Sequence, residues 1–266
     1  MIQRKFIGFS FSLFLACSSL FSNTHYTNDI ELGAVGYNLT RTKTGGTKQK
    51  GLLTGLIVNY DRIKRNSFYL GADAYWAKGD MHGHSGSGRI LKSIITDIEA
   101  EGRVGFTIRS KGEKKPFFTP FVGYGYFRET NQFKAPYPMT ITYNDSFDYY
   151  AVGFVSGINV CKDFSVGINV KWKWMNEGTC KISNEPIDDY TDPSTANPEL
   201  IIESQWQYTI EMPLDFHPKK WSKRCWLNLV PFYEYRHFGG RENFPSDYID
   251  TQERILGARL TFLFRF

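Results

Sequence analysis

The sequence predicts an all-β protein that folds as a transmembrane antiparallel up-and-down β-barrel of about ten strands. Three observations lead to this prediction. Apolar and polar residues alternate along most of the chain, aromatic residues make up 17% of it, and the connections between alternating segments are short and long in turn. A mean hydropathy of −0.37 excludes a bundle of membrane helices, because each helix needs about 20 consecutive apolar residues.

The N-terminus predicts export. Arg4 and Lys5 precede an apolar stretch, residues 6–21, and a polar segment follows it, which is the layout of a signal peptide. We expect cleavage after residue 22, so that residues 23–266 form one barrel domain; lipidation at Cys17 is an alternative. Losing residues 1–22 lowers the formal charge from +5 to +3, which is too small to indicate a nucleic-acid partner.

The alternation is clearest over residues 164–174. Apolar residues occupy the even-numbered positions from Phe164 to Trp174, and polar residues or glycine occupy the odd-numbered positions from Ser165 to Lys173. Such a strand has one apolar and one polar face. Eight or twelve strands remain open, because some of the segments alternate weakly. The ten predicted strands lie at roughly 29–39, 51–60, 67–77, 97–108, 116–129, 146–160, 164–174, 205–216, 225–238 and 256–266.

A soluble β-sandwich also alternates, with the apolar faces of its two sheets packed together. The distribution of aromatic residues favours the membrane barrel instead. Trp and Tyr gather towards the strand ends on the apolar face, as in Trp76, Tyr124, Trp172, Trp206 and Tyr235. Aromatic girdles of this kind mark the two interfaces of a bilayer.

The connections alternate in length, as in barrels with short periplasmic turns and long extracellular loops. The short turns carry a summed charge of +9, which suits anionic lipid headgroups. They lie at 61–66, 110–115, 161–163 and 218–224, and the longer loops at 41–50, 78–92, 130–145, 176–204 and 239–252.

The C-terminus carries the most specific motif. Apolar residues alternate up to a terminal aromatic residue, at Gly257, Leu260, Phe262, Phe264 and Phe266. With this ending the mature chain resembles the bacterial outer-membrane β-barrel superfamily, in which the last strand is the signal read by the assembly machinery. The resemblance implies a Gram-negative bacterium, an outer-membrane location, and outer-membrane lipids and that machinery as partners. Ile255 departs from the usual polar residue two positions before the glycine.

Ten strands enclose a narrow interior, which side chains alone can nearly fill. The polar face of the alternation predicts that acidic residues line one wall of this lumen and basic residues another. Either the two walls pair and plug the barrel, or they border a thin pore for small charged solutes. The predicted lumen residues are Asp73, Asp97, Glu99, Glu101, Arg103, Lys171, Lys173, Glu234, Arg236 and Arg259.

These features predict a narrow porin-like channel with a charged lumen. The alternative is a surface-exposed adhesin or binding protein that acts through its long loops on a host surface ligand. Residues 176–204 favour this alternative, because the loop is long and carries a net charge of −6.

Evidence for catalysis is weak. Asp80, His82 and His84 have metal-ligand residue types, but the surrounding glycines indicate a flexible loop. With ten predicted strands the chain also resembles the omptin outer-membrane proteases, whose site combines an Asp-Asp pair and an Asp-His pair on extracellular loops. Here Asp80 and His82 lie on the second predicted loop, and Asp188 and Asp189 lie on the fourth. The two pairs are therefore on the opposite loops from those of the omptin family. We therefore expect no enzyme activity, metal or cofactor. Three cysteines of the mature chain, Cys161, Cys180 and Cys225, indicate no disulfide framework.

Overall fold

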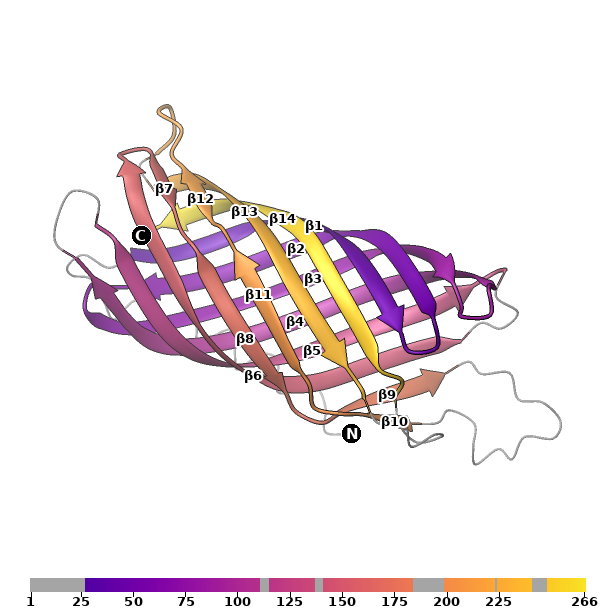
Figure 1. Ribbon diagram of the computed structural model, residues 1–266. Helices are drawn as coiled ribbons and strands as arrows, with labels where there is room; N and C mark the ends of the chain where they lie inside the picture. Colours follow the sequence, from indigo (N-terminus) through magenta and orange to yellow (C-terminus); the bar gives the residue numbers. More distant parts are fainter. Residues whose placement is uncertain (1–26, 111–114, 137–140, 184–198, 223, 241–247) are drawn as a thin grey trace, which may run out of the picture.

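The chain forms one closed antiparallel sheet that is rolled into a barrel (Figure 1). The computed structural model describes residues 27–110, 115–136, 141–183, 199–222, 224–240 and 248–266. The predicted signal peptide and Cys17 lie outside these ranges. Within the described residues no helix is long and apolar enough to cross a membrane.

The first six strands are long, with 17 to 20 residues each. The later part of the chain is divided into shorter strands. In chain order the strands are β1 (Thr27–Lys43), β2 (Thr47–Ile63), β3 (Ser67–His84), β4 (Ile90–Arg109), β5 (Phe117–Lys134), β6 (Thr142–Cys161), β7 (Phe164–Val166), β8 (Asn169–Met175), β9 (Gly178–Ser183), β10 (Glu199–Ile202), β11 (Trp206–Glu211), β12 (Leu214–Phe216), β13 (Cys225–Phe238) and β14 (Thr251–Arg265).

The ring closes between the first and last strands. β1 pairs with β14 from Asp29↔Arg265 to Lys43↔Thr251. Beyond this ladder, Asn28 and Phe266 exchange both backbone hydrogen bonds, at 3.1 and 3.0 Å. The start of β1 and the end of β14 therefore lie side by side at the end of the barrel that carries the short turns, which we call the short-turn end. The opposite end is the long-loop end.

The described residues form fourteen strands rather than about ten, although the wall is crossed ten times. Two crossings are each split in two, β7 with β8 and β12 with β11. The two interruptions lie beside each other in neighbouring crossings, at Gly167 and Pro213. The Gly167 amide donates a hydrogen bond to the Pro213 carbonyl at 2.9 Å. Pro213 has no amide hydrogen to continue the ladder, which explains why the strand is interrupted there.

The two additional strands come from the segment predicted as the fourth loop. β9 pairs with the long-loop end of β6, from Thr142↔Ser183 to Ser146↔Thr179, and β10 pairs with β9. They form a hairpin that lies outside the ring path. The alternation of Cys180 and Ile182 with polar residues is too short to be recognised in the sequence as a strand.

The loop predicted at 78–92 is also mostly strand, because β3 runs to His84 and β4 begins at Ile90. Above the apolar band the outward face of β3 turns polar, with Lys78, Asp80 and His82, while the inward face is small, with Ala77 and Gly79. A strand with no lipid-facing residues resembles a loop in sequence. A span of about 9–11 residues crosses a bilayer, so these strands extend the wall beyond the apolar band.

The outer surface is apolar around the barrel, as a lipid-facing surface must be. Phe68, Leu56 and Phe262 are more than 60% exposed. Aromatic rings stack on the outer face of β8, β11 and β13. The ring centroids of Trp172 and Trp206 are 5.1 Å apart, and their ring planes are inclined by 14°. This apolar and aromatic outer surface supports a transmembrane barrel over a sandwich.

Thiol accessibility tests the position of the β9–β10 hairpin. Cys161 is exposed, whereas Cys180, on the β9 strand of the hairpin, is buried. Burial also raises the pKa of the Cys180 thiol, so the reactive thiolate form is scarce. In single-cysteine variants of the refolded barrel, we expect a maleimide reagent to modify Cys161 within minutes and Cys180 only after unfolding. Equal labelling rates in the folded state would show that Cys180 is not buried in this hairpin.

Candidate functional site

The lumen holds the largest concentration of buried charge in the described structure. All ten predicted lumen residues lie on the inner face of the barrel. Asp97, Glu99 and Arg236 are at most 2% exposed. The less buried members, Asp73, Arg103, Lys171 and Arg259, have side chains that are 11 to 16% exposed.

The middle of the lumen is crossed by ion pairs that join strands from opposite walls. Lys173 on β8 donates to Glu99 on β4 at 2.6 Å and to Glu234 on β13 at 3.0 Å. Arg236 on β13 donates to Asp97 on β4 at 3.1 Å. Seven residues make up this central network, namely Asp97, Glu99, Glu101, Lys171, Lys173, Glu234 and Arg236.

Three inward tyrosines complete the central network. Tyr37 donates to Asp97 at 2.6 Å, and Tyr149 donates to Glu99 at 2.6 Å and to Glu101 at 2.9 Å. Tyr75 accepts a hydrogen bond from Arg236 at 2.5 Å. The sequence predicted tyrosines only as girdle residues, and these three were not among them. Each tyrosine lies two positions from a buried, inward residue of the same strand, namely Val35, Ala77 or Ala151. This position in the alternation distinguishes the three tyrosines from the outward residues of the girdle.

The ring of Tyr149 lies against Gly125 on the neighbouring strand β5. A Cβ atom at Gly125 would lie 2.3 Å from the Cζ atom of Tyr149, which is far inside van der Waals contact. Glycine is therefore required here for the tyrosine to reach Glu99 and Glu101.

A second group of ion pairs lies nearer the long-loop end. Arg41 on β1 donates to Glu129 on β5, across the lumen, and to Glu253 on β14 beside it. Arg236 lies 3.6 Å from Glu253 and so links this group to the central network. Arg41 and Glu253 were not predicted as lumen residues, because Arg41 falls in the predicted loop 41–50 and Glu253 lies between the predicted loop 239–252 and the predicted strand 256–266.

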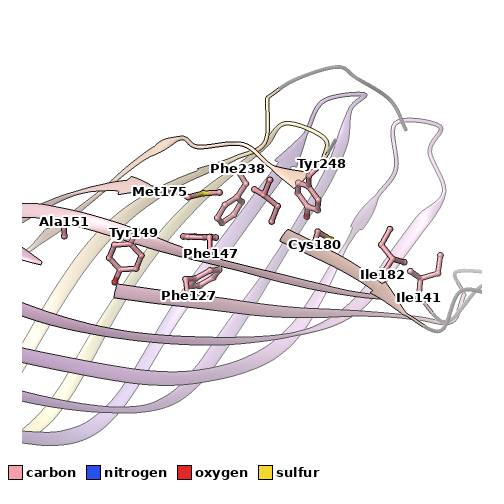
Figure 2. Packing of buried hydrophobic residues seen from close by; sticks show 11 residues of the cluster. Phe127, Ile141, Phe147, Tyr149, Ala151, Met175, Cys180, Ile182, Phe238 and Tyr248 are labelled. Atoms are coloured by element: carbon pink, nitrogen blue, oxygen red, sulfur yellow. The ribbon is translucent and has the colours of Figure 1, made fainter. Parts of the chain in front are cut away.

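A cluster of buried apolar side chains packs inside the barrel towards the long-loop end (Figure 2). Phe127, Phe147 and Phe238 point inwards from three strands of the wall, with ring centroids 5.0 to 6.2 Å apart. The β9–β10 hairpin contributes further members to this cluster. Its buried residues are Phe127, Ile141, Phe147, Tyr149, Ala151, Met175, Cys180, Ile182, Ile202, Phe238 and Tyr248.

Open space in the lumen lies mainly below the central network. A cavity of about 300 Å³ occupies the half nearer the short-turn end. Beside Lys171, Lys173 and Glu99 the remaining void is about 30 Å³, the volume that one water molecule takes in the liquid. The interior is thus filled by apolar and charged side chains at the centre and towards the long-loop end, and is hollow towards the short-turn end.

The residues considered for catalysis do not gather in this interior. Asp80, His82 and His84 lie on the outward, exposed face of β3, and Asp188 and Asp189 lie outside the described residues. His237 hydrogen-bonds Asp250 near the long-loop end, a pair that no sequence motif indicated. Among the described residues, no group of three or more His, Cys, Asp and Glu side chains could hold a metal ion.

The C-terminal motif covers the second half of β14 and Phe266, the residue that follows it. Leu260, Phe262, Phe264 and Phe266 are exposed on the outer face. Gly257 points inwards and lies against Tyr37, where a Cβ atom would approach the tyrosine Cβ to 2.5 Å. The recognition of this strand by assembly machinery stays a prediction.

Comparison with known proteins identifies the fold. The outer membrane protease OmpT of Escherichia coli has 12% identity to this chain and a TM-score of 0.55; the alignment covers 92% of this chain and 98% of OmpT. The translocator domain of the autotransporter NalP of Neisseria meningitidis has 10% identity and a TM-score of 0.43, with 97% and 95% coverage. No family model and no curated protein sequence matches the chain. The likeness to OmpT shows the fold of the bacterial outer-membrane β-barrels.

Replacing Lys173 tests the energetic weight of the central network. Lys173→Met removes the cation that faces Glu99 and Glu234, and leaves two buried carboxylates with fewer partners. We expect the barrel to lose about 3–5 kcal/mol of unfolding free energy. Urea unfolding in detergent, followed by tryptophan fluorescence, measures this loss. Lys50→Met on the exposed outer wall is the matched control, with an expected change within about 0.5 kcal/mol. Equal effects of the two substitutions would contradict a structural role for the network.

Proposed function

We propose that this protein resides in the bacterial outer membrane as a closed barrel and acts as a surface-exposed binding protein. The single observation that carries the proposal is the central network, which spans the lumen from β4 to β8 and β13. The fold supports the location, and the filled interior favours binding at the surface over passage through the barrel.

A narrow porin-like channel for small charged solutes would require the central network to open. A solute on the axis would have to displace Lys173 from Glu99 and Glu234, and Arg236 from Asp97. Separating buried charge pairs costs several kcal/mol, because each group loses its partner in a medium that solvates it poorly. The solute would also have to push apart the side chains of the apolar cluster. We therefore propose that the resting barrel does not conduct.

The extended wall at the long-loop end offers a charged surface for binding. Lys50, His82, Lys92 and Lys134 occupy directly opposed positions on β2, β3, β4 and β5. All four side chains point outwards and are exposed. We call this set the basic row. Adjacent strands lie about 4.8 Å apart, so the row presents basic groups at regular, close intervals.

The composition of the basic row indicates an anionic ligand. Like charges directly opposite each other destabilise a sheet, and Lys92 faces Lys134 in this way. None of the four side chains forms an ion pair with any described residue within 4.0 Å. An acidic polysaccharide, with negative groups repeated along an extended chain, would neutralise the row without requiring a pocket.

We propose no catalytic role. The omptin arrangement needs an Asp-Asp pair and an Asp-His pair at one site, whereas Asp80 and His82 project from the outer wall away from the lumen. A general acid or base must lie within hydrogen-bond reach of the group that it serves. The exposed face of β3 offers no second described carboxylate in that position.

Conductance tests whether the barrel is closed. The refolded protein, confirmed by heat-modifiable gel migration, is inserted into planar bilayers. We expect no steady conductance, because ion pairs and apolar side chains fill the lumen. Discrete steps whose ion selectivity changes in Lys171→Glu would establish a channel and overturn the closed-barrel proposal.

Binding to dextran sulfate tests the basic row, with neutral dextran as the uncharged control. We expect the double variant Lys92→Gln and Lys134→Gln to bind about 10-fold more weakly, because two charges are lost, and salt to weaken wild-type binding. The matched control is Lys219→Gln with Lys220→Gln, which removes two exposed lysines at the short-turn end. Equal losses in both double variants would indicate nonspecific attraction to a basic protein.

A further inference from the structure

The cavity below the central network has the properties of a binding site. Its volume of about 300 Å³ is at the lower limit of pockets that hold small molecules. Residues from the wall on all sides line it, including Ile63, Gly157 and Asn159 at the short-turn end. The central network and the apolar cluster separate it from the long-loop end, so it can fill only from the short-turn end.

Most charged groups in the wall of this cavity already have partners. Arg103 pairs with Asp73 at 3.0 Å, and Arg259 pairs with Glu211 at 2.7 Å. Arg265 reaches Asp215 at 3.0 Å as well as Asp29 at 3.3 Å. These pairs neutralise one another and leave little net attraction for a simple ion.

Glu31 is a cavity carboxylate without a cation. It is 8% exposed and accepts hydrogen bonds only from neutral donors among the described residues. These donors are Thr261 at 2.8 Å, Asn228 at 3.2 Å and Asn59 at 3.3 Å. No described Lys, Arg or His nitrogen lies within 4.0 Å of it, so Glu31 has no ion-pair partner among the described residues.

Arg109 is the opposite case in the same cavity wall. Its guanidinium lies over the ring of Phe117, 5.1 Å from the centroid, and no described carboxylate lies within 4.0 Å. Its Nε atom is buried without a hydrogen-bond acceptor. The cavity wall therefore contains a buried carboxylate and a guanidinium that each lack an ion-pair partner among the described residues.

Further polar atoms in the wall also lack partners. The Oδ1 atoms of Asp29 and Asn228 are buried and accept no hydrogen bond, and both residues are more than nine-tenths buried. The Nε atoms of Arg103 and Arg259 donate none. Leaving a buried polar group unsatisfied is costly, so the cavity favours an occupant with several donors and acceptors.

We propose that this cavity binds a small zwitterion of the amino-acid or dipeptide class. The ligand's ammonium group would face Glu31, and its carboxylate would face Arg109. A simple cation or anion would neutralise only one of these two residues and leave the other unpaired. This site lies at the opposite end of the barrel from the basic row, so it is a binding activity separate from the proposed surface function.

Binding of glycylglycine to the full refolded chain, measured by calorimetry in detergent at neutral pH, tests this site. Two analogues each lack one charge, namely N-acetylglycylglycine without the ammonium and glycylglycine amide without the carboxylate. We expect one glycylglycine per barrel, and at least about 10-fold weaker binding of each analogue, since each loses a charged hydrogen-bond contact.

Variants locate the binding within the cavity. Glu31→Gln and Arg109→Gln each remove the charge and keep a polar side chain at the position, and each should weaken binding at least about 10-fold. Glu199→Gln and Lys48→Gln, exposed near the long-loop end, are the matched controls and should bind as the wild type does. Heat-modifiable migration confirms that every variant is folded.

Three results would overturn the proposal. The first is that neither glycylglycine nor glycine binds the folded wild-type barrel below about 10 mM, the range of very weak affinity. The second is that a single-charge analogue binds as tightly as glycylglycine. The third is that folded Glu31→Gln and Arg109→Gln both keep wild-type affinity, which would place any binding elsewhere.

Discussion

Closure of the sheet by the β1–β14 pair is the constraint on which the rest of the structure depends. A bilayer offers no hydrogen bonds to an open strand edge, so the backbone must pair all the way round. The ladder from Asp29↔Arg265 to Lys43↔Thr251 satisfies this requirement. It also creates two separate environments, because outward side chains meet lipid and inward side chains meet only one another.

The narrowness of the barrel explains how its interior is organised. With ten crossings of the wall, side chains from opposite walls reach one another, so that Lys173 contacts both Glu99 and Glu234. Burying a charge is costly unless it is paired and hydrogen-bonded, and the central network meets this condition with tyrosine hydroxyls as additional donors. Near the short-turn end the side chains leave a cavity, and there Glu31 and Arg109 lack ion-pair partners among the described residues. The closed centre and the polar cavity are therefore parts of one arrangement.

The period of two predicted the ten crossings of the wall and the side that each lumen residue faces. Lys171, Trp172 and Lys173 show why, since a residue in a strand points to the face opposite its neighbours. The strand boundaries were predicted less accurately where the strands extend beyond the apolar band that faces lipid. Asp80 and His82 were predicted in a loop because a polar outer face removes the alternation, and the split at Pro213 and the hairpin at Cys180 involve too few residues to show a period.

The sequence alone determined the fold class, the order of the crossings and the inward side of the ten predicted lumen residues, because these follow from the local alternation along each strand. Only the tertiary structure decided which charges meet. Tyr37 reaches Asp97 from 60 positions away, and Arg41 reaches Glu253 from 212 positions away. Such partners depend on how the ring closes and on the relative shift of distant strands, which no local pattern contains. The same geometry decided that Glu31 and Arg109 stay unpaired, although their residue types are those of the paired groups around them.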